Sequence, residues 1–224
     1  MAGTRTWLGF AGGVSMLATM GIPGQADAAL LTSWTNITNN GNTNVGSQLE
    51  VEYLDAGAGQ ITFEFRNNVG VASSITDIYF DDATGGPAVL NSLISVASFG
   101  GASFSAGATP PNLPGGNSIS PAFVVSAGLS ADSDAPVAPN GINSSTRSVL
   151  LTFSYAGGMD FSDVEAALGS GVLRIGMHIQ AIAPQGGSDS YVNGGTPVPE
   201  PGTLALLGAG LLGLAFAWRR REKA

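Results

Sequence analysis

The side chains best suited to chemistry in this chain are one histidine and a few closely spaced aspartates. His178 is the only histidine, and the chain contains no cysteine. A Ser–His–Asp hydrolase would need His178, but no Gly-x-Ser-x-Gly motif occurs in the sequence. Sites built from several histidines or from cysteine thiolates are excluded by the same counts. Because His178 alternates with apolar residues over residues 174–180, we expect it to point to solvent from a strand.

Five aspartates form two groups that offer the oxygen ligands preferred by calcium. Asp77, Asp81 and Asp82 lie near the end of one expected strand, and Asp132 and Asp134 form an Asp-x-Asp pair in an expected loop. Neither group matches the EF-hand pattern. Two interpretations remain open, a weak extracellular calcium site and ordinary solvated acids at turns. We expect no other cofactor.

Carboxylates and a tryptophan also raise the question of carbohydrate chemistry. Glycoside hydrolases use paired carboxylates, but Glu50, Glu52 and Glu64 fall on the polar faces of expected strands, where solubility explains them. We therefore do not expect an enzyme. Trp34 is the only tryptophan between the two terminal segments; it is either a stacking platform for a sugar or a core residue at a strand entry.

The elements that must position these residues are strands. Apolar and polar residues alternate over residues 49–53 and again over residues 61–65, with a turn at residues 55–59. Further strands are expected at residues 75–80, 96–104, 122–125, 149–155 and 172–182. Segments rich in Gly, Pro, Asn and Ser separate them. This pattern predicts an all-β ectodomain folded as a β-sandwich, with a jelly roll as one possible form.

One short helix interrupts the strands. Ser162-Asp163-Val164-Glu165 has the pattern of a capping box, and Gly169 follows the last apolar residue of the segment. We expect this helix to cover one end of the sandwich.

The charge balance excludes one class of partner. The chain has 8 Lys plus Arg against 16 Asp plus Glu. A nucleic-acid-binding protein needs a basic surface, so we expect no nucleic-acid partner.

The N-terminus has the three regions of a secretory signal peptide. Arg5 precedes the charge-free segment 7–22, and Ala26-Asp27-Ala28 has the small-x-small pattern of a cleavage site. We predict a signal peptide over residues 1–28, export by the secretion machinery, and a mature ectodomain over residues 29–196.

The C-terminus has three features in a fixed order over residues 197–224. Pro199-Glu200-Pro201 comes first, an apolar segment over about residues 202–218 follows, and Arg219, Arg220 and Arg221 begin the basic end at residues 219–224. At 1.5 Å per residue, a helix over the apolar segment spans roughly 25 Å, enough for a short membrane crossing. The arginines would stay on the cytoplasmic side, which leaves the ectodomain outside.

This order of features resembles the PEP-CTERM sorting signal of bacterial exosortase substrates. The resemblance implies that the tail holds the exported protein in the inner membrane until an exosortase-type membrane enzyme processes it near Pro-Glu-Pro. It also implies a final place at the cell surface or outside the cell, and an association with exopolysaccharide. Parts of the ectodomain, residues 173–178 and 187–193, are more loosely similar to other such proteins.

Two functions are therefore expected. The first is a structural or adhesive protein of the cell surface or extracellular matrix, associated with exopolysaccharide or biofilm. The second is a carbohydrate-binding or carbohydrate-active module, which would depend on calcium if the aspartate groups bind it.

Overall fold

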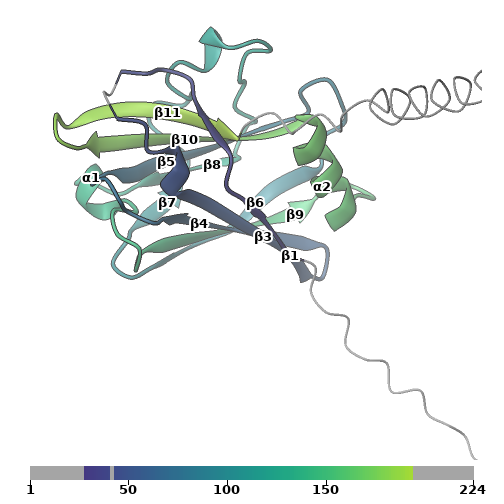
Figure 1. Cartoon of the computed structure of the whole chain (residues 1–224). Helices are drawn as coiled ribbons and strands as arrows, with labels where there is room; N and C mark the ends of the chain where they lie inside the picture. Colours follow the sequence, from purple (N-terminus) through teal and green to yellow (C-terminus); the bar gives the residue numbers. More distant parts are fainter. Residues whose placement is uncertain (1–27, 41–42, 194–224) are drawn as a thin grey trace, which may run out of the picture.

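Two antiparallel sheets packed face to face form the ectodomain, as Figure 1 shows. The computed structural model describes residues 28–40 and 43–193. The five-stranded sheet has the order β1-β3-β4-β9-β6, and the six-stranded sheet has the order β2-β11-β10-β5-β8-β7. The prediction of a β-sandwich is confirmed.

The bounds of the elements are as follows. The five-stranded sheet contains β1 (Ala28–Leu31), β3 (Leu49–Gly57), β4 (Gln60–Asn67), β9 (Ser148–Tyr155) and β6 (Leu90–Phe99). The six-stranded sheet contains β2 (Trp34–Asn36), β11 (Gly187–Asn193), β10 (Leu173–Ile182), β5 (Ser74–Asp82), β8 (Ser130–Ser133) and β7 (Phe104–Ala106). The helices are α1 (Val137–Asn140) and α2 (Phe161–Ser170), with 3-10 turns η1 (Gly46–Gln48) and η2 (Gly116–Ser118).

The alternating segments form the centre of the five-stranded sheet. Phe63 of β4 lies opposite Tyr53 of β3 and Leu151 of β9, and all three face inward. Phe63, Phe80 of β5 and Phe153 of β9 pack edge to face, with ring centroids 4.7–5.8 Å apart. Such pairs add specific geometry to the apolar burial. The aromatic cluster therefore joins the two sheets.

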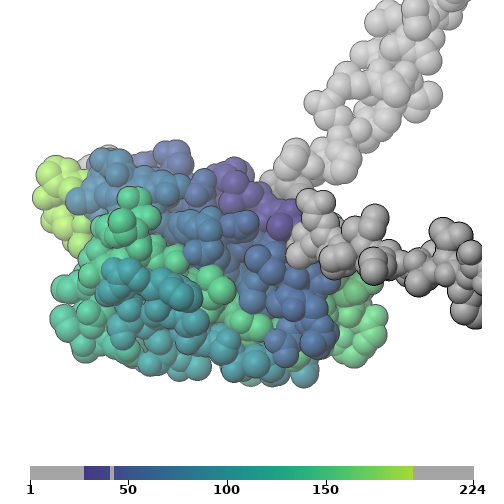
Figure 2. Space-filling view, turned by 90° about the horizontal axis from the view of Figure 1, so that it is seen from below, coloured from purple at the N-terminus to yellow at the C-terminus, as the bar shows by residue number. Residues whose placement is uncertain are grey.

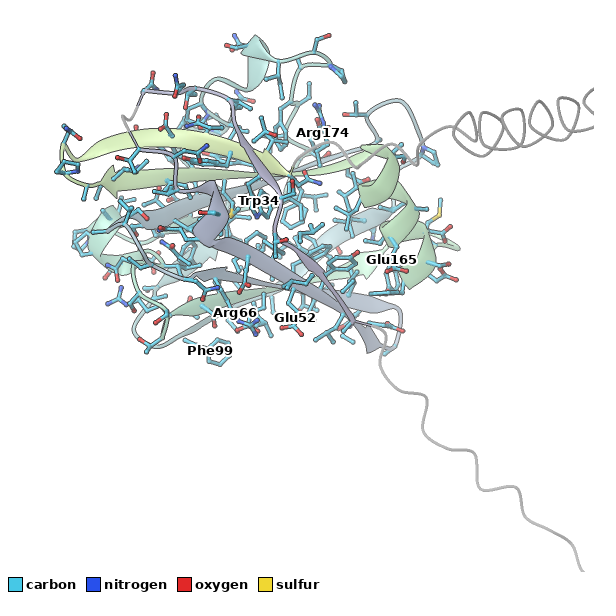
Figure 3. All side chains as sticks on the ribbon, in the orientation of Figure 1. Trp34, Glu52, Arg66, Phe99, Glu165 and Arg174 are labelled. Atoms are coloured by element: carbon cyan, nitrogen blue, oxygen red, sulfur yellow. The ribbon has the colours of Figure 1, made fainter. Side chains whose placement is uncertain are left out.

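Trp34 is part of this core and does not form an exposed platform. Its side chain lies between the two layers in Figure 3 and is 8% exposed. The indole Nε1 donates a hydrogen bond to the carbonyl oxygen of Leu49 at 2.9 Å. Because both faces of the ring are enclosed in the core, Trp34 cannot stack on a sugar.

Two of the predicted strands were wrong. The segment expected at residues 96–104 breaks after Phe99, because Gly100 takes φ +66° and a Cβ there would lie 1.9 Å from the carbonyl oxygen of Thr146. The segment expected at residues 122–125 forms no strand. It belongs to the long loop over residues 107–129, and its Phe123 is buried against the six-stranded sheet. Strands β1, β2, β8 and β11 were not expected from the sequence.

Helix α2 begins two residues earlier than predicted. Asp160 is the N-cap, and its side chain accepts hydrogen bonds from the backbone N–H groups of Ser162 and Asp163. The helix continues through Gly169 and ends at Gly171, where φ is +78°. Phe161, Val164 and Leu168 are buried, so the helix covers one end of the sandwich as expected.

The 107–129 loop covers the outer face of the six-stranded sheet, at the top of Figure 1. Its residues Leu113 and Phe123 form a second small core with Tyr79 and Val192. This cover requires Gly176 in β10, because a Cβ there would lie 2.7 Å from Leu113 Cδ2 and 3.0 Å from Phe123 Cζ. Both faces of this sheet are therefore buried, although its sequence alternates like a half-exposed sheet.

Candidate functional site

The predicted tail residues lie outside the described part of the chain. This applies to Pro199, Glu200 and Pro201, to Arg219, Arg220 and Arg221, and to Ala26 of the predicted cleavage site. Ala28, the other cleavage residue, is the first residue of β1 and lies opposite Leu54. Within residues 28–40 and 43–193, no helix is both long and apolar enough to cross a membrane.

Asp77, Asp81 and Asp82 do not form one cluster. Asp81 is 3% exposed and pairs with the guanidinium of Arg174, while its oxygens also accept from Thr84 Oγ1 at 2.8 Å and Val124 N at 3.0 Å. The Asp82 carboxylate accepts instead from the backbone N–H groups of Val89 and Leu90, at 3.0 and 2.7 Å. Each carboxylate therefore stabilises a different part of the fold.

Asp132 and Asp134 are likewise separated. The Asp134 carboxylate accepts hydrogen bonds from Ser103 Oγ at 2.6 Å and Ser105 Oγ at 2.8 Å, and these bonds lower its pKa. Asp132 instead lies opposite Asp77 in the β5–β8 register. Among the described residues, no three His, Asp or Glu side chains are grouped so that they could hold a metal ion. The structure thus offers no calcium site of the expected composition in this region.

Asp77, Asp132 and His178 form a buried polar cluster on three adjacent strands. Asp77 is 1% exposed, and its Oδ2 lies 2.9 Å from His178 Nδ1 and 2.7 Å from Thr76 Oγ1. The expectation that His178 points to solvent was wrong, since only 12% of its side chain is exposed. Strand alternation correctly placed His178 on the face of β10 opposite Met177 and Ile179, but it did not show that the ring would pair with Asp77 of β5.

Asp132 is the member of this cluster whose pKa is raised. Burial and the neighbouring charge of Asp77 raise the pKa of Asp132 to about 6. Its Oδ2 accepts from the Thr109 backbone N–H at 3.1 Å, whereas its Oδ1 is buried without a hydrogen-bond partner. The charged groups that act on it are Asp77 from β5 and Asp134, which follows the end of β8, and His178 from β10 lies beyond Asp77. A proton on Asp132 relieves the repulsion between the two carboxylates.

We expect this cluster to make the folded state less stable as pH rises from 5 to 7. Because the folded-state pKa of Asp132 is raised, its stabilising contribution is present at low pH and is lost as pH rises through about 6. The loss should be up to about 1 kcal/mol, since water screens part of the charge of this half-buried side chain. Urea unfolding at both pH values measures it.

The matched variant is Asp132→Asn, which imitates the protonated acid and retains an oxygen for the Thr109 amide. In this variant the free energy of unfolding should depend less on pH, because Asp132 no longer titrates. Some dependence should remain in both proteins, because burial also raises the pKa of Asp82. An identical pH dependence in the two proteins would contradict the assignment to Asp132.

Arg174 is the functional residue that sequence reasoning missed. It is 8% exposed and lies above the six-stranded sheet in Figure 3. Its Nη1 donates to the Pro121 carbonyl at 2.8 Å, and its Nη2 donates to the Ala122 carbonyl at 2.6 Å and to Asp81. The guanidinium also lies 5.3 Å from the centroid of the Phe123 ring. One side chain therefore fastens the 107–129 loop to β10 and β5. An arginine between the apolar residues Leu173 and Ile175 was the available signal.

On the outer face of the five-stranded sheet, the charged side chains lie at one end. Arg66 pairs with Glu64 and lies 2.9 Å from Glu52 Oε2, and Figure 3 shows Arg66, Glu52 and Phe99 on this side. Beyond these charges, the register aligns hydroxyl groups in two rows. We call this the hydroxyl face; it comprises Thr152 and Ser95 in one row and Ser154 and Ser92 in the next, with Thr62 and the Gln60 amide beside them on β4.

This face is open. Figure 2 views the molecule from below, the side of the five-stranded sheet, and shows purple, blue, teal and green segments at the surface. Ser92 and Ser154 contact each other at 3.0 Å between their hydroxyl oxygens. Thr62 Oγ1 is itself buried and has no hydrogen-bond partner. The face therefore brings together the hydroxyl groups of Thr152 and Ser154 on β9 with those of Ser95 and Ser92 on β6, where β-bulges interrupt the register.

The fold and tail together define an exported β-sandwich protein with a C-terminal sorting signal. The family model described as the PEP-CTERM protein-sorting motif matches residues 197–221, which confirms the resemblance of the tail. Comparison with curated proteins and with solved structures finds no match. The chain is accordingly an exosortase-sorted exported protein that is processed at the membrane.

Proposed function

We propose that the ectodomain is a non-catalytic structural or adhesive component of the cell surface or extracellular matrix, associated with exopolysaccharide. The observation that carries the proposal is the hydroxyl face. Strands of an antiparallel sheet lie about 4.8 Å apart, so the hydroxyl groups of Thr152 and Ser154 on β9 and of Ser95 and Ser92 on β6 form a cluster of neighbouring donors and acceptors. Such a cluster suits the repeated hydroxyl groups of a polysaccharide. Export by way of the sorting motif would bring the face to that polymer.

A sedimentation experiment with exopolysaccharide purified from the source bacterium tests this role. Thr152→Glu places a charge in the middle of the hydroxyl face and should reduce co-sedimentation about tenfold, a loss of about 1.4 kcal/mol. Ser118→Glu adds the same charge at an exposed position of η2 and serves as the matched control. Equal binding by the two variants would contradict the role of this face. A glycan array with and without a chelator separates calcium-dependent binding, the alternative function, from binding through hydroxyl groups.

The tail makes a second prediction. If Pro199-Glu200-Pro201 directs processing, Glu200→Ala should leave full-length protein in the inner membrane while the unchanged protein is released. The reason is that the extended backbone around two prolines lies next to the acidic side chain that the enzyme would read. Mass spectrometry of protein recovered from membranes and medium measures both forms. Mature unchanged protein that still carries Trp218 and the arginines would contradict processing at this site.

A further inference from the structure

A hollow of about 370 Å³ lies beside Asn193, the last described residue before the tail. Its walls come from the 107–129 loop, the C-terminal end of α2, and the ends of β2, β10 and β11. Apolar side chains form much of the lining, and the principal ones are Ile37, Ile119, Pro121, Leu168 and Val192. Asn193 itself belongs to the lining. This pocket is therefore largely apolar and lies at Asn193, where the chain leaves the domain.

Arg174 contributes a polar group to this pocket. Its side chain is nine-tenths buried, and its Nε has no hydrogen-bond partner although both Nη atoms donate to other groups. The Asp81 carboxylate balances the positive charge of the guanidinium. An anion consequently gains little here, so the pocket favours a segment without charged side chains.

The segment that follows Asn193 is uncharged and partly apolar, which matches the apolar lining of this pocket. Gly194-Gly195-Thr196-Pro197-Val198-Pro199 carries no charged side chain. Pro and Val supply apolar surface, and each proline offers a carbonyl oxygen without an N–H group that would need a partner. An extended chain advances roughly 3.3–3.6 Å per residue, so five residues reach about 17 Å, enough to cross the pocket.

We propose that the pocket beside Asn193 binds the chain's own Thr196-Pro197-Val198 segment and so holds the sorting motif against the ectodomain. Because the segment is tethered at the pocket, its effective concentration is on the order of millimolar, and even a weak intrinsic affinity keeps the pocket filled. The inference concerns presentation of Pro199-Glu200-Pro201 and does not depend on the polysaccharide role. Its failure would leave that role untouched.

Disulfide trapping in the full-length protein in detergent tests the proposal, because the chain has no cysteine of its own. Ser120 lines the pocket and is exposed, while Ser118 is exposed on the same loop but is not part of the lining. The pair Ser120→Cys with Thr196→Cys should form a disulfide about tenfold faster than the pair Ser118→Cys with Thr196→Cys. Non-reducing gel mobility and peptide mass spectrometry measure the two rates.

A change in the segment itself provides the second arm. In the Ser120→Cys with Thr196→Cys protein, Val198→Asp should abolish the tenfold preference because it places a charge against apolar walls. Val198→Ile should retain it. The segment follows the last strand of the sandwich, so we expect these substitutions to leave the fold intact. Equal trapping rates at positions 118 and 120, or a preference that survives Val198→Asp, would overturn the proposal.

Discussion

Phe63→Ala should lower the free energy of unfolding by about 3–5 kcal/mol. Phe63 is 0% exposed and contacts the rings of Tyr53, Phe80 and Phe153, so the substitution leaves a cavity where the two sheets meet. Its neighbours come from both sheets and cannot close around the gap without moving the sheets together. Urea unfolding of the full-length protein, followed by tryptophan fluorescence and circular dichroism, measures the loss.

Thr62→Ala is the control for this prediction. Thr62 is adjacent in sequence but faces the opposite side of β4, and its hydroxyl has no hydrogen-bond partner. Its replacement should change the free energy of unfolding by no more than about 0.5 kcal/mol. Similar losses at the two positions would show that the inward face of β4 has been assigned incorrectly.

Arg174→Met should lower the free energy of unfolding by a similar amount, about 3–5 kcal/mol. The substitution keeps an apolar stem of similar length but leaves the Asp81 carboxylate buried without its cationic partner. It also removes the bonds to the Pro121 and Ala122 carbonyls. Cleavage within the 107–129 loop by a broad-specificity protease should therefore become faster than cleavage elsewhere in the domain.

The double variant Arg174→Met with Asp81→Asn separates the charge effect from the loss of packing. Asn removes the unpaired charge, and its Oδ1 can still accept from the Val124 N–H group. We expect the double variant to be more stable than Arg174→Met alone by about 1–3 kcal/mol, since a neutral amide costs less to bury than an unpaired carboxylate. If the double variant were less stable than Arg174→Met, the unpaired charge of Asp81 would not be the cause of the stability loss in Arg174→Met.

Some parts of the site could be predicted because their signals are local. A sorting tail is an ordered run of Pro-Glu-Pro, apolar residues and arginines, so it can be recognised without a fold, and residues 197–221 match the family model. The β3–β4 hairpin was also predictable, because alternation determines which side chains share a face. The start of α2 was missed by two residues because both Asp160 and Ser162 are good N-caps, and only the backbone geometry distinguishes them.

The amino-acid sequence by itself determined the alternating faces of β3 and β4 and the sorting tail, because each depends on neighbours along the chain. Only the tertiary structure decided the environment of Arg174 and His178. Periodicity put both on the outer face of β10, but the 107–129 loop, distant in sequence, covers Arg174, and Asp77 of β5 pairs with His178. The same packing paired Asp81 with Arg174 and Asp77 with Asp132, which separated aspartates that the sequence had grouped. Strand pairing and loop cover bring together residues from separate parts of the chain, and no local pattern specifies such contacts.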